Sequence, residues 1–296
     1  MRLFDLHCDT LSECMENHYG FDDQRLSVTI DDNLQIFEPW KQVFVLWTPD
    51  NVPKGENRNH GRRLLDTYYK MLDSYPGKLT RGNALLALEN SELLDDALTE
   101  LPFWKEKGVC YITLTWNGQN RAAGGCQSDG GLTDFGKRLL AQMAKLNIAV
   151  DLSHLNDKSF YEVIEQAQGP VLASHSNLRS VCSHRRNLTE EQFLLIIQRG
   201  GIVGLTFCDY FLKEGGAAGL EDIWRHLYRF YELGGEKSLC LGSDYDGAPM
   251  PKEIANSRDL PQLWEFLLKK GLSEEQCDAL FYQNAADYFE KTFQHL

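Results

Sequence analysis

Eight short apolar runs recur along the whole chain and limit the folds that it can adopt. The runs do not alternate polar with apolar residues, which is typical of parallel strands that are buried on both faces. Between them lie segments whose apolar residues have helical spacing, and two of these begin at a threonine that can cap a helix. The expected strands are residues 3–7, 43–47, 84–88, 110–115, 148–153, 170–174, 202–206 and 239–243. The expected helices are residues 61–74, 133–146, 189–199, 220–233 and 259–270.

Strands that alternate with helices in this number, over about 250 residues, indicate an α/β fold of the (β/α)8 TIM barrel type. A doubly wound open sheet is the alternative arrangement of the same elements. No change of composition marks a linker, so we expect residues 1–296 to form a single barrel domain. The stretch 48–59, rich in proline, asparagine and glycine, is expected to be a loop.

The composition restricts the partners and the compartment. Hydrophobic residues make up 43% of the chain and the net charge is −13, a charge that disfavours nucleic acid and anionic membranes as partners. There is no apolar window long enough to span a bilayer, and the N-terminal residues do not have the apolar stretch of a signal peptide. The eight cysteines are scattered without a CxxC pair. These features predict a cytoplasmic protein with reduced thiols.

Residues that bind metals or transfer protons follow the ends of five expected strands. A lone histidine or aspartate at such a position is more often a hydrogen-bonded structural residue or a loop cap. Structural roles at all five strand ends would require five independent coincidences. Catalytic groups of TIM barrels lie at the C-terminal ends of the strands, which explains all five positions together. In chain order these residues are His7, Asp9, Glu89, His154, His175 and Asp244.

The residue types at these positions suit a metal site. His7 and Asp9 are two positions apart, a spacing that on a strand points both side chains the same way. An imidazole and a carboxylate together suit Zn²⁺ or a similar divalent ion. Glu89 can bridge two ions, since the fourth strand ends without a lysine that could do so. His154 and His175 could complete a second metal site.

The order and spacing of several short motifs are similar to those of one known family. The chain resembles the membrane dipeptidase (renal dipeptidase) family, peptidase M19, and looks like a bacterial-type member without the lipid anchor. This resemblance implies a binuclear zinc enzyme with an amidohydrolase-type barrel, which cleaves dipeptides through a metal-bridging hydroxide. The motifs are FDLHCDT at the first strand, ALE at 87–89, DLSH at 151–154, ASHS at 173–176, RRN at 185–187 and GSDYDG at 242–247.

The resemblance also implies roles for single residues. The histidine and aspartate of the first strand look like ligands of one zinc, and the two later histidines look like ligands of the other. Glu89 matches the bridge, Asp244 the catalytic acid and base, and Arg186 the residue that binds the substrate carboxylate. Trp116 stands where mammalian members have a histidine that contacts the substrate, and Cys208 replaces a pocket tyrosine. These two departures predict a changed preference for substrate side chains.

The expected substrate is a small dipeptide. The resemblance also implies that its C-terminal residue can be a D-amino acid. By resemblance alone, the expected oligomer is a homodimer. One alternative is another binuclear amidohydrolase on the same barrel, acting on an N-acyl amino acid, a cyclic amide or a β-lactam-like amide. A second alternative is a barrel that binds peptides without turnover.

Overall fold

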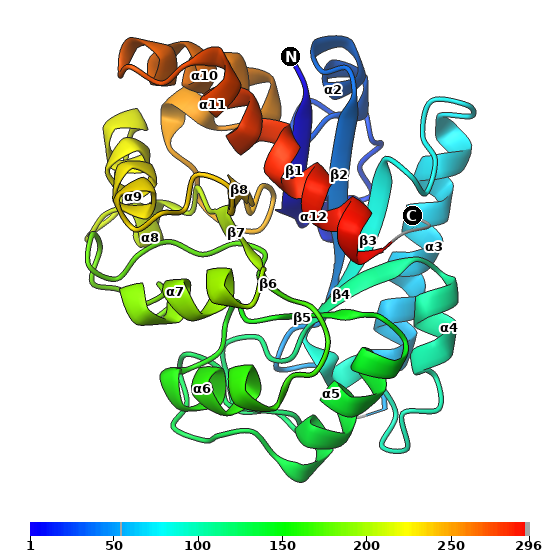
Figure 1. Cartoon of the computed structure of the whole chain (residues 1–296). Coiled ribbons are helices and arrows are strands. Elements are labelled where there is room, and N and C mark those ends of the chain that lie inside the picture. The colour runs from blue at the N-terminus through cyan, green and yellow to red at the C-terminus, as the bar shows by residue number, and fades with distance from the viewer. Residues whose placement is uncertain (54, 294–296) are drawn as a thin grey trace.

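The computed structural model describes residues 1–53 and 55–293. Eight parallel strands follow one another around a closed barrel, in which β8 pairs with β1 (Figure 1). The expected (β/α)8 TIM barrel is therefore confirmed, and the open sheet is excluded because the sheet has no edge. The strands are β1 (Leu3–Cys8), β2 (Trp40–Trp47), β3 (Ala84–Glu89), β4 (Val109–Thr113), β5 (Ala149–Asp151), β6 (Val171–Ala173), β7 (Ile202–Leu205) and β8 (Leu239–Leu241).

The helices surround the barrel, and the five that were expected are present as α3, α5, α7, α9 and α10. Thr133 and Thr189 cap two of them, since their hydroxyls accept hydrogen bonds from the backbone N–H groups of Gly136 and Gln192. One of the helices, α3, begins at Asn57, inside the stretch that was expected to be a loop. The helices are α1 (Thr10–Asn17), α2 (Ile30–Ile36), α3 (Asn57–Ser74), α4 (Leu101–Glu106), α5 (Asp134–Lys145), α6 (Asp157–Gln166), α7 (Glu190–Gln198), α8 (Asp209–Leu212), α9 (Leu220–Glu232), α10 (Leu260–Lys269), α11 (Glu274–Asp278) and α12 (Asn284–Thr292).

Successive strand residues divide between two apolar cores. Phe4 and Val43 belong to the core inside the barrel, whereas their neighbours Leu3 and Phe44 belong to the core between the strands and the surrounding helices. This division explains the unbroken apolar runs of the sequence, because a strand of a TIM barrel is covered on both faces.

The last helix, α12, closes one end of the barrel (Figure 1). Tyr288 and Phe289 of this helix belong to the inner core, and the Phe289 ring centre lies 4.8 Å from that of Phe4. The Asn284 side chain donates a hydrogen bond to the carbonyl of Leu239 at the start of β8. The closed end is thus the N-terminal end of the strands, and the C-terminal end is left for a binding site.

Two further observations concern the surroundings of the protein. None of the helices formed by residues 1–53 and 55–293 is long and apolar enough to cross a membrane. All eight cysteines are buried and free, which agrees with the scattered pattern seen in the sequence.

Candidate active site

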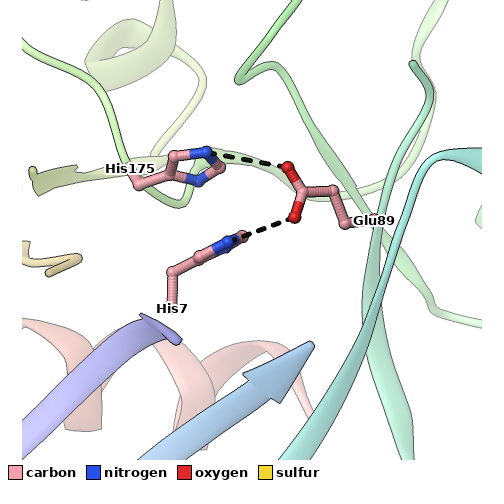
Figure 2. Close-up of side chains that lie close together, drawn as sticks. All are labelled: His7, Glu89 and His175. Atoms are coloured by element: carbon pink, nitrogen blue, oxygen red, sulfur yellow. Dashed lines mark ion pairs between the residues drawn. The ribbon is translucent and has the colours of Figure 1, made fainter. Parts of the chain in front are cut away.

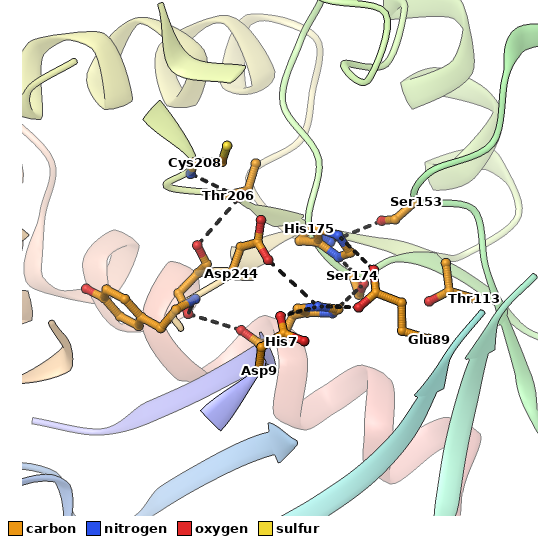
Figure 3. A network of polar contacts seen from close by, with 12 residues as sticks. His7, Asp9, Glu89, Thr113, Ser153, Ser174, His175, Thr206, Cys208 and Asp244 are labelled. Carbon is orange, nitrogen blue, oxygen red and sulfur yellow. Dashed lines mark hydrogen bonds and ion pairs between the residues drawn. The ribbon is translucent and has the colours of Figure 1, made fainter. Parts of the chain in front are cut away.

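The six residues predicted from the strand ends meet at the C-terminal end of the barrel. Figure 3 shows His7, Asp9, Glu89, His175 and Asp244 of this group. Each is at most 8% exposed, so the polar groups form a buried cluster. Charged and polar side chains at such depth require partners, because their transfer from water is costly. The cluster consists of His7, Asp9, Glu89, His154, His175 and Asp244.

A break in the pairing of β1 turns His7 into the site. Asp5 lies opposite Gln42 of β2 whereas Cys8 lies opposite Phe44, so one extra residue is inserted into β1 between them. His7 can therefore face the barrel interior although the preceding Leu6 also packs there. Cys8 packs in the outer core, as expected for a residue with no part in the site.

Asp9 reaches the same cluster by a different route from the one expected. It lies beyond the end of β1, at the N-cap of α1, with φ −100° and ψ 14°. Its Oδ2 atom lies 3.6 Å from His7 Nε2. The two side chains thus converge because the chain turns into a helix, and not because both stand on one face of a strand.

Glu89 presents one oxygen to each side of the cluster (Figure 2). Its Oε2 lies 3.3 Å from Nε2 of His7. Its Oε1 lies 2.9 Å from Nε2 of His154 and 3.9 Å from Nε2 of His175. A carboxylate placed between two groups of ligands in this way has the geometry of a bridge between two cations.

The other ring nitrogen of each histidine is held by a hydrogen-bond acceptor. The Ser174 hydroxyl donates to Asp151 at 2.6 Å, so its oxygen accepts from Nδ1 of His175 at 2.7 Å. The same oxygen lies 3.3 Å from Nδ1 of His7. The amide oxygen of Asn117 lies 3.1 Å from Nδ1 of His154. In the form that binds a metal, with the single proton on Nδ1, all three imidazoles would turn the lone pair of Nε2 toward the cluster, as metal-binding histidines do.

The residues present fit metal ions. The Nε2 atoms of His154 and His175 lie only 2.9 Å apart, and two facing lone pairs repel unless a cation lies beside both. His7 Nε2 is fully buried and has no hydrogen-bond partner among the described residues. The ligand atoms of His7, Asp9 and Asp244 lie within 4.8 Å of one another, and so do those of His7, Glu89 and His175. Nitrogen and carboxylate ligands in such sets suit divalent transition-metal ions.

The pKa values of the cluster favour a bound cation. Burial raises the pKa of Asp9 to about 6 and that of Asp244 well above its usual range. Burial would also raise the pKa of Glu89, but His7 and His154 lower it well below its usual value. Burial lowers the pKa of His154 to about 4 and that of His175 well below its usual value, so both are neutral ligands at neutral pH. Burial would also lower the pKa of His7, but Glu89 and Asp9 raise it well above its usual value, so a bound cation takes the place of the second proton of His7.

Four residues of the cluster, Asp9, Glu89, His154 and Asp244, line a cavity of about 330 Å³. Trp47 and Trp116 line one part of it, with their ring centres 5.2 Å apart and edge to face. Cys208, Phe211 and Asp244 also line the cavity. Trp116 therefore stands in the wall, as expected for a residue that contacts a substrate.

Arg186 lies behind this wall and does not itself line the cavity. It is 4% exposed, and its guanidinium donates to the Ser176 hydroxyl at 3.2 Å and to the His175 carbonyl at 3.0 Å. Its Nε has no partner among the described residues, and the guanidinium lies 5.6 Å from the ring centre of Phe211. The Nε–H group of Arg186 thus has no acceptor among the described residues and remains available to a ligand.

The sequence interpretation missed the residues that orient the histidines. Asp151, Ser174 and Asn117 were not among the candidate site residues, and their spacing in the sequence does not predict a contact between them. The first two stand within the DLSH and ASHS motifs, each close to a histidine, and that proximity was the available signal. Thr113 of β4 also donates to Asp151 Oδ2, at 2.6 Å.

The sequence model of the membrane dipeptidase family (peptidase family M19) matches residues 1–294. The chain belongs to this family. As a membrane dipeptidase family member it is a metal-dependent peptidase that hydrolyses dipeptides, which makes the cluster at the barrel mouth its candidate active site.

Relatives of this family member agree in sequence or fold. An uncharacterised Klebsiella pneumoniae protein from the region 5′ of pqqA is 32% identical over 209 residues, which cover 67% of this chain and 77% of that protein. The crystal structure of a Rhodobacter sphaeroides metallopeptidase, bound to a phosphinate mimic of L-Ala-D-Ala, is 24% identical with a TM-score of 0.93 over 99% of both chains. A crystal structure described as dipeptidase AC is 26% identical with a TM-score of 0.89, again over 99% of both chains.

Proposed function

We propose that this chain is a zinc dipeptidase that uses two ions bridged by Glu89. The observation that carries the proposal is the division of the Glu89 oxygens, one toward His7 and the other toward His154 and His175. Histidine and carboxylate ligands with neutral imidazoles are typical of zinc sites. His7 and Asp9 would hold one ion, and the two later histidines the other.

Asp244 would serve as the acid and base. Its carboxylate lines the cavity, its Oδ1 lies 3.9 Å from His7 Nε2, and its raised pKa suits a group that takes up and releases a proton. Two zinc ions, when bound, supply Lewis acidity for the scissile carbonyl and activate water at neutral pH. Asp244 then accepts the proton of the attacking water and delivers it to the leaving amine.

Arg186 would bind the free carboxylate at the C-terminal end of the dipeptide. A guanidinium with an unused N–H, held by Ser176 and His175 beside the cavity, suits a carboxylate. Trp116 would contact the side chains of the substrate. The phosphinate in the Rhodobacter relative mimics a dipeptide with a D-residue at its C-terminal end, and we extend that tolerance to this chain.

Composition and family resemblance favour one compartment and one oligomeric state for the enzyme. The acidic composition and the free buried cysteines favour a cytoplasmic enzyme. The family resemblance favours a homodimer of single-domain chains that extend over residues 1–296.

The test is hydrolysis of a panel of L-Xaa-L-Xaa and L-Xaa-D-Xaa dipeptides by protein of measured metal content. We expect two zinc ions per chain, loss of turnover on chelation and its return with Zn²⁺. Two bound ions without cleavage of any dipeptide would contradict the proposed substrate and favour another amide. A single ion per chain would contradict the bridging role of Glu89.

A further inference from the structure

The wall of the active-site cavity is strongly acidic. Six of its lining side chains are carboxylates, and no described lysine or arginine lines it. A cavity with charges of one sign and low-dielectric walls concentrates ligands of the opposite sign. The six carboxylates are Asp9, Glu13, Glu16, Glu89, Asp244 and Asp246.

Four of these carboxylates belong to the candidate metal site or accept hydrogen bonds from the protein. Three belong to the cluster at the strand ends. The fourth, Asp246, accepts hydrogen bonds from the Thr10 hydroxyl at 2.5 Å and from the Ser27 backbone N–H at 2.6 Å. Glu13 and Glu16 are left. Within the described residues neither forms an ion pair, and only Glu13 accepts a side-chain hydrogen bond, from Asn17 through one of its two oxygens.

Glu13 and Glu16 continue a line of carboxylates that starts in the metal cluster. Asp9 is the N-cap of α1, and the three residues have the spacing i, i+4 and i+7, which places them on one face of a helix. Along the helix axis Glu13 lies about 6 Å and Glu16 about 10 Å beyond Asp9. The shorter of these lengths is about the reach of an extended arginine or lysine side chain, and Glu16 lies beyond its charged end.

Asp244 supplies an independent indication of a ligand in the same cavity. It is 8% exposed and faces the cavity, and its carboxylate accepts no hydrogen bond from the described residues. Its backbone has φ +67°, a conformation that is strained for a residue other than glycine. A buried carboxylate without a hydrogen bond favours a cationic partner in the cavity, which a bound metal ion or a cationic group of the substrate can supply.

The position of α1 decides which part of a dipeptide it meets. Arg186 follows β6, and α1 follows β1, so three steps around the barrel separate them, by way of β7 and β8. A dipeptide whose C-terminal carboxylate binds Arg186 therefore extends its N-terminal residue toward α1. The α-ammonium group lies next to the scissile bond and stays near the cluster. Only a long side chain reaches Glu13 and approaches Glu16.

We propose that Glu13 and Glu16 select dipeptides whose N-terminal residue has a cationic side chain, arginine or lysine. This proposal rests on the proposed function, because it takes the same cavity as the substrate site. Water-exposed ion pairs are individually weak, so we expect a preference of roughly three- to tenfold in kcat/KM from the two carboxylates together. Such a preference must weaken as salt screens the charges.

The experiment compares L-Arg-L-Ala with L-citrullyl-L-Ala, which has nearly the same shape without the charge. The measured quantity is the ratio of their kcat/KM values, at low and at high salt. The variants are Glu13→Gln, Glu16→Gln and the double substitution. Glu265→Gln is the control, because Glu265 is an exposed carboxylate on the outer helix α10 and does not line the cavity.

The wild-type ratio should favour L-Arg-L-Ala, fall toward one in the double variant and in high salt, and stay unchanged in Glu265→Gln. A wild-type ratio of one, with good cleavage of both dipeptides, would overturn the selection by charge and leave the dipeptidase function intact. A ratio that the double variant does not lower would overturn the role of α1. If neither dipeptide nor any other is cleaved, the proposed function itself fails.

Discussion

The Ser174 hydroxyl lies 2.6 Å from Oδ2 of Asp151 and donates its only proton to it. For this reason the oxygen of Ser174 acts only as an acceptor toward the Nδ1 atoms of His7 and His175, at 3.3 and 2.7 Å. One hydroxyl thus fixes the tautomer of a ligand in each half of the proposed metal centre.

Replacing Ser174 by alanine should weaken the binding of both metal ions. The expected loss is about 10- to 100-fold in affinity, since both imidazoles lose the acceptor that holds the proton on Nδ1. Isothermal titration of the metal-free protein with Zn²⁺ measures it. The control is Thr115→Val, because the buried Thr115 hydroxyl has no partner among the described residues. Unchanged affinity for both ions would show that Ser174 is only a packing residue.

Asp244→Asn should keep the metal and lose turnover. The amide has nearly the same shape but cannot carry the proton to the leaving amine, so kcat should fall by about 10²- to 10⁴-fold. Metal analysis beside the kinetics separates an acid–base role of Asp244 from a role as metal ligand. The second role is open because ligand atoms of His7, Asp9 and Asp244 lie within 4.8 Å of one another. A fall in bound metal would make Asp244 a ligand, and a normal kcat would remove it from the mechanism.

Arg186→Met should abolish the preference for a free C-terminal carboxylate. The methionine side chain is uncharged and shorter than that of arginine, and it cannot donate a hydrogen bond to the substrate carboxylate. The readout is kcat/KM for a dipeptide divided by that for its C-terminal amide. We expect this ratio to fall about 10- to 100-fold. Circular dichroism must show a folded protein, because Arg186 is buried. A ratio equal to that of the wild type would place the carboxylate elsewhere.

His226 should make the folded state sensitive to acid. It is fully buried in α9, where Nδ1 accepts from the Leu178 backbone N–H and Nε2 donates to the Leu212 carbonyl, a pair of bonds that requires the neutral ring. Burial lowers its pKa to about 4. Below pH 6.5 the unfolded chain therefore binds the proton that the folded chain excludes. His226 alone should lower the free energy of unfolding by about 3 kcal/mol between pH 6.5 and 4, in addition to the contributions of the other groups that titrate there.

Urea unfolding of the metal-free protein at several pH values measures this dependence. In His226→Gln the loss over this window should be smaller by most of that amount, since glutamine does not titrate. The control is His18→Asn, a substitution of an exposed histidine that leaves His226 in place. Identical profiles for His226→Gln and the wild type would assign the acid sensitivity to other groups.

The barrel and the cluster could be predicted because each depends on local patterns. Buried parallel strands give unbroken apolar runs, and the residues that follow them must meet at one end of the barrel. The short helix α1 could not be predicted, because its eight residues have few apolar side chains and it forms under the constraint of Asp9 and Asp246. The extra residue in β1 and the contact of Ser174 with Asp151 depend on pairing between strands, which no spacing in one sequence reveals.

The packing of Phe289 of α12 on Phe4 of β1 has a consequence for the biosynthesis of the chain. The inner core joins the first strand to the last helix, so its apolar surface stays open while the ribosome is still making the intervening residues. The barrel can be sealed only after α12 has emerged from the exit tunnel. A nascent chain of this protein must therefore be shielded from aggregation throughout its translation. A stop codon before α12 would release a barrel that is open at the N-terminal end of its strands.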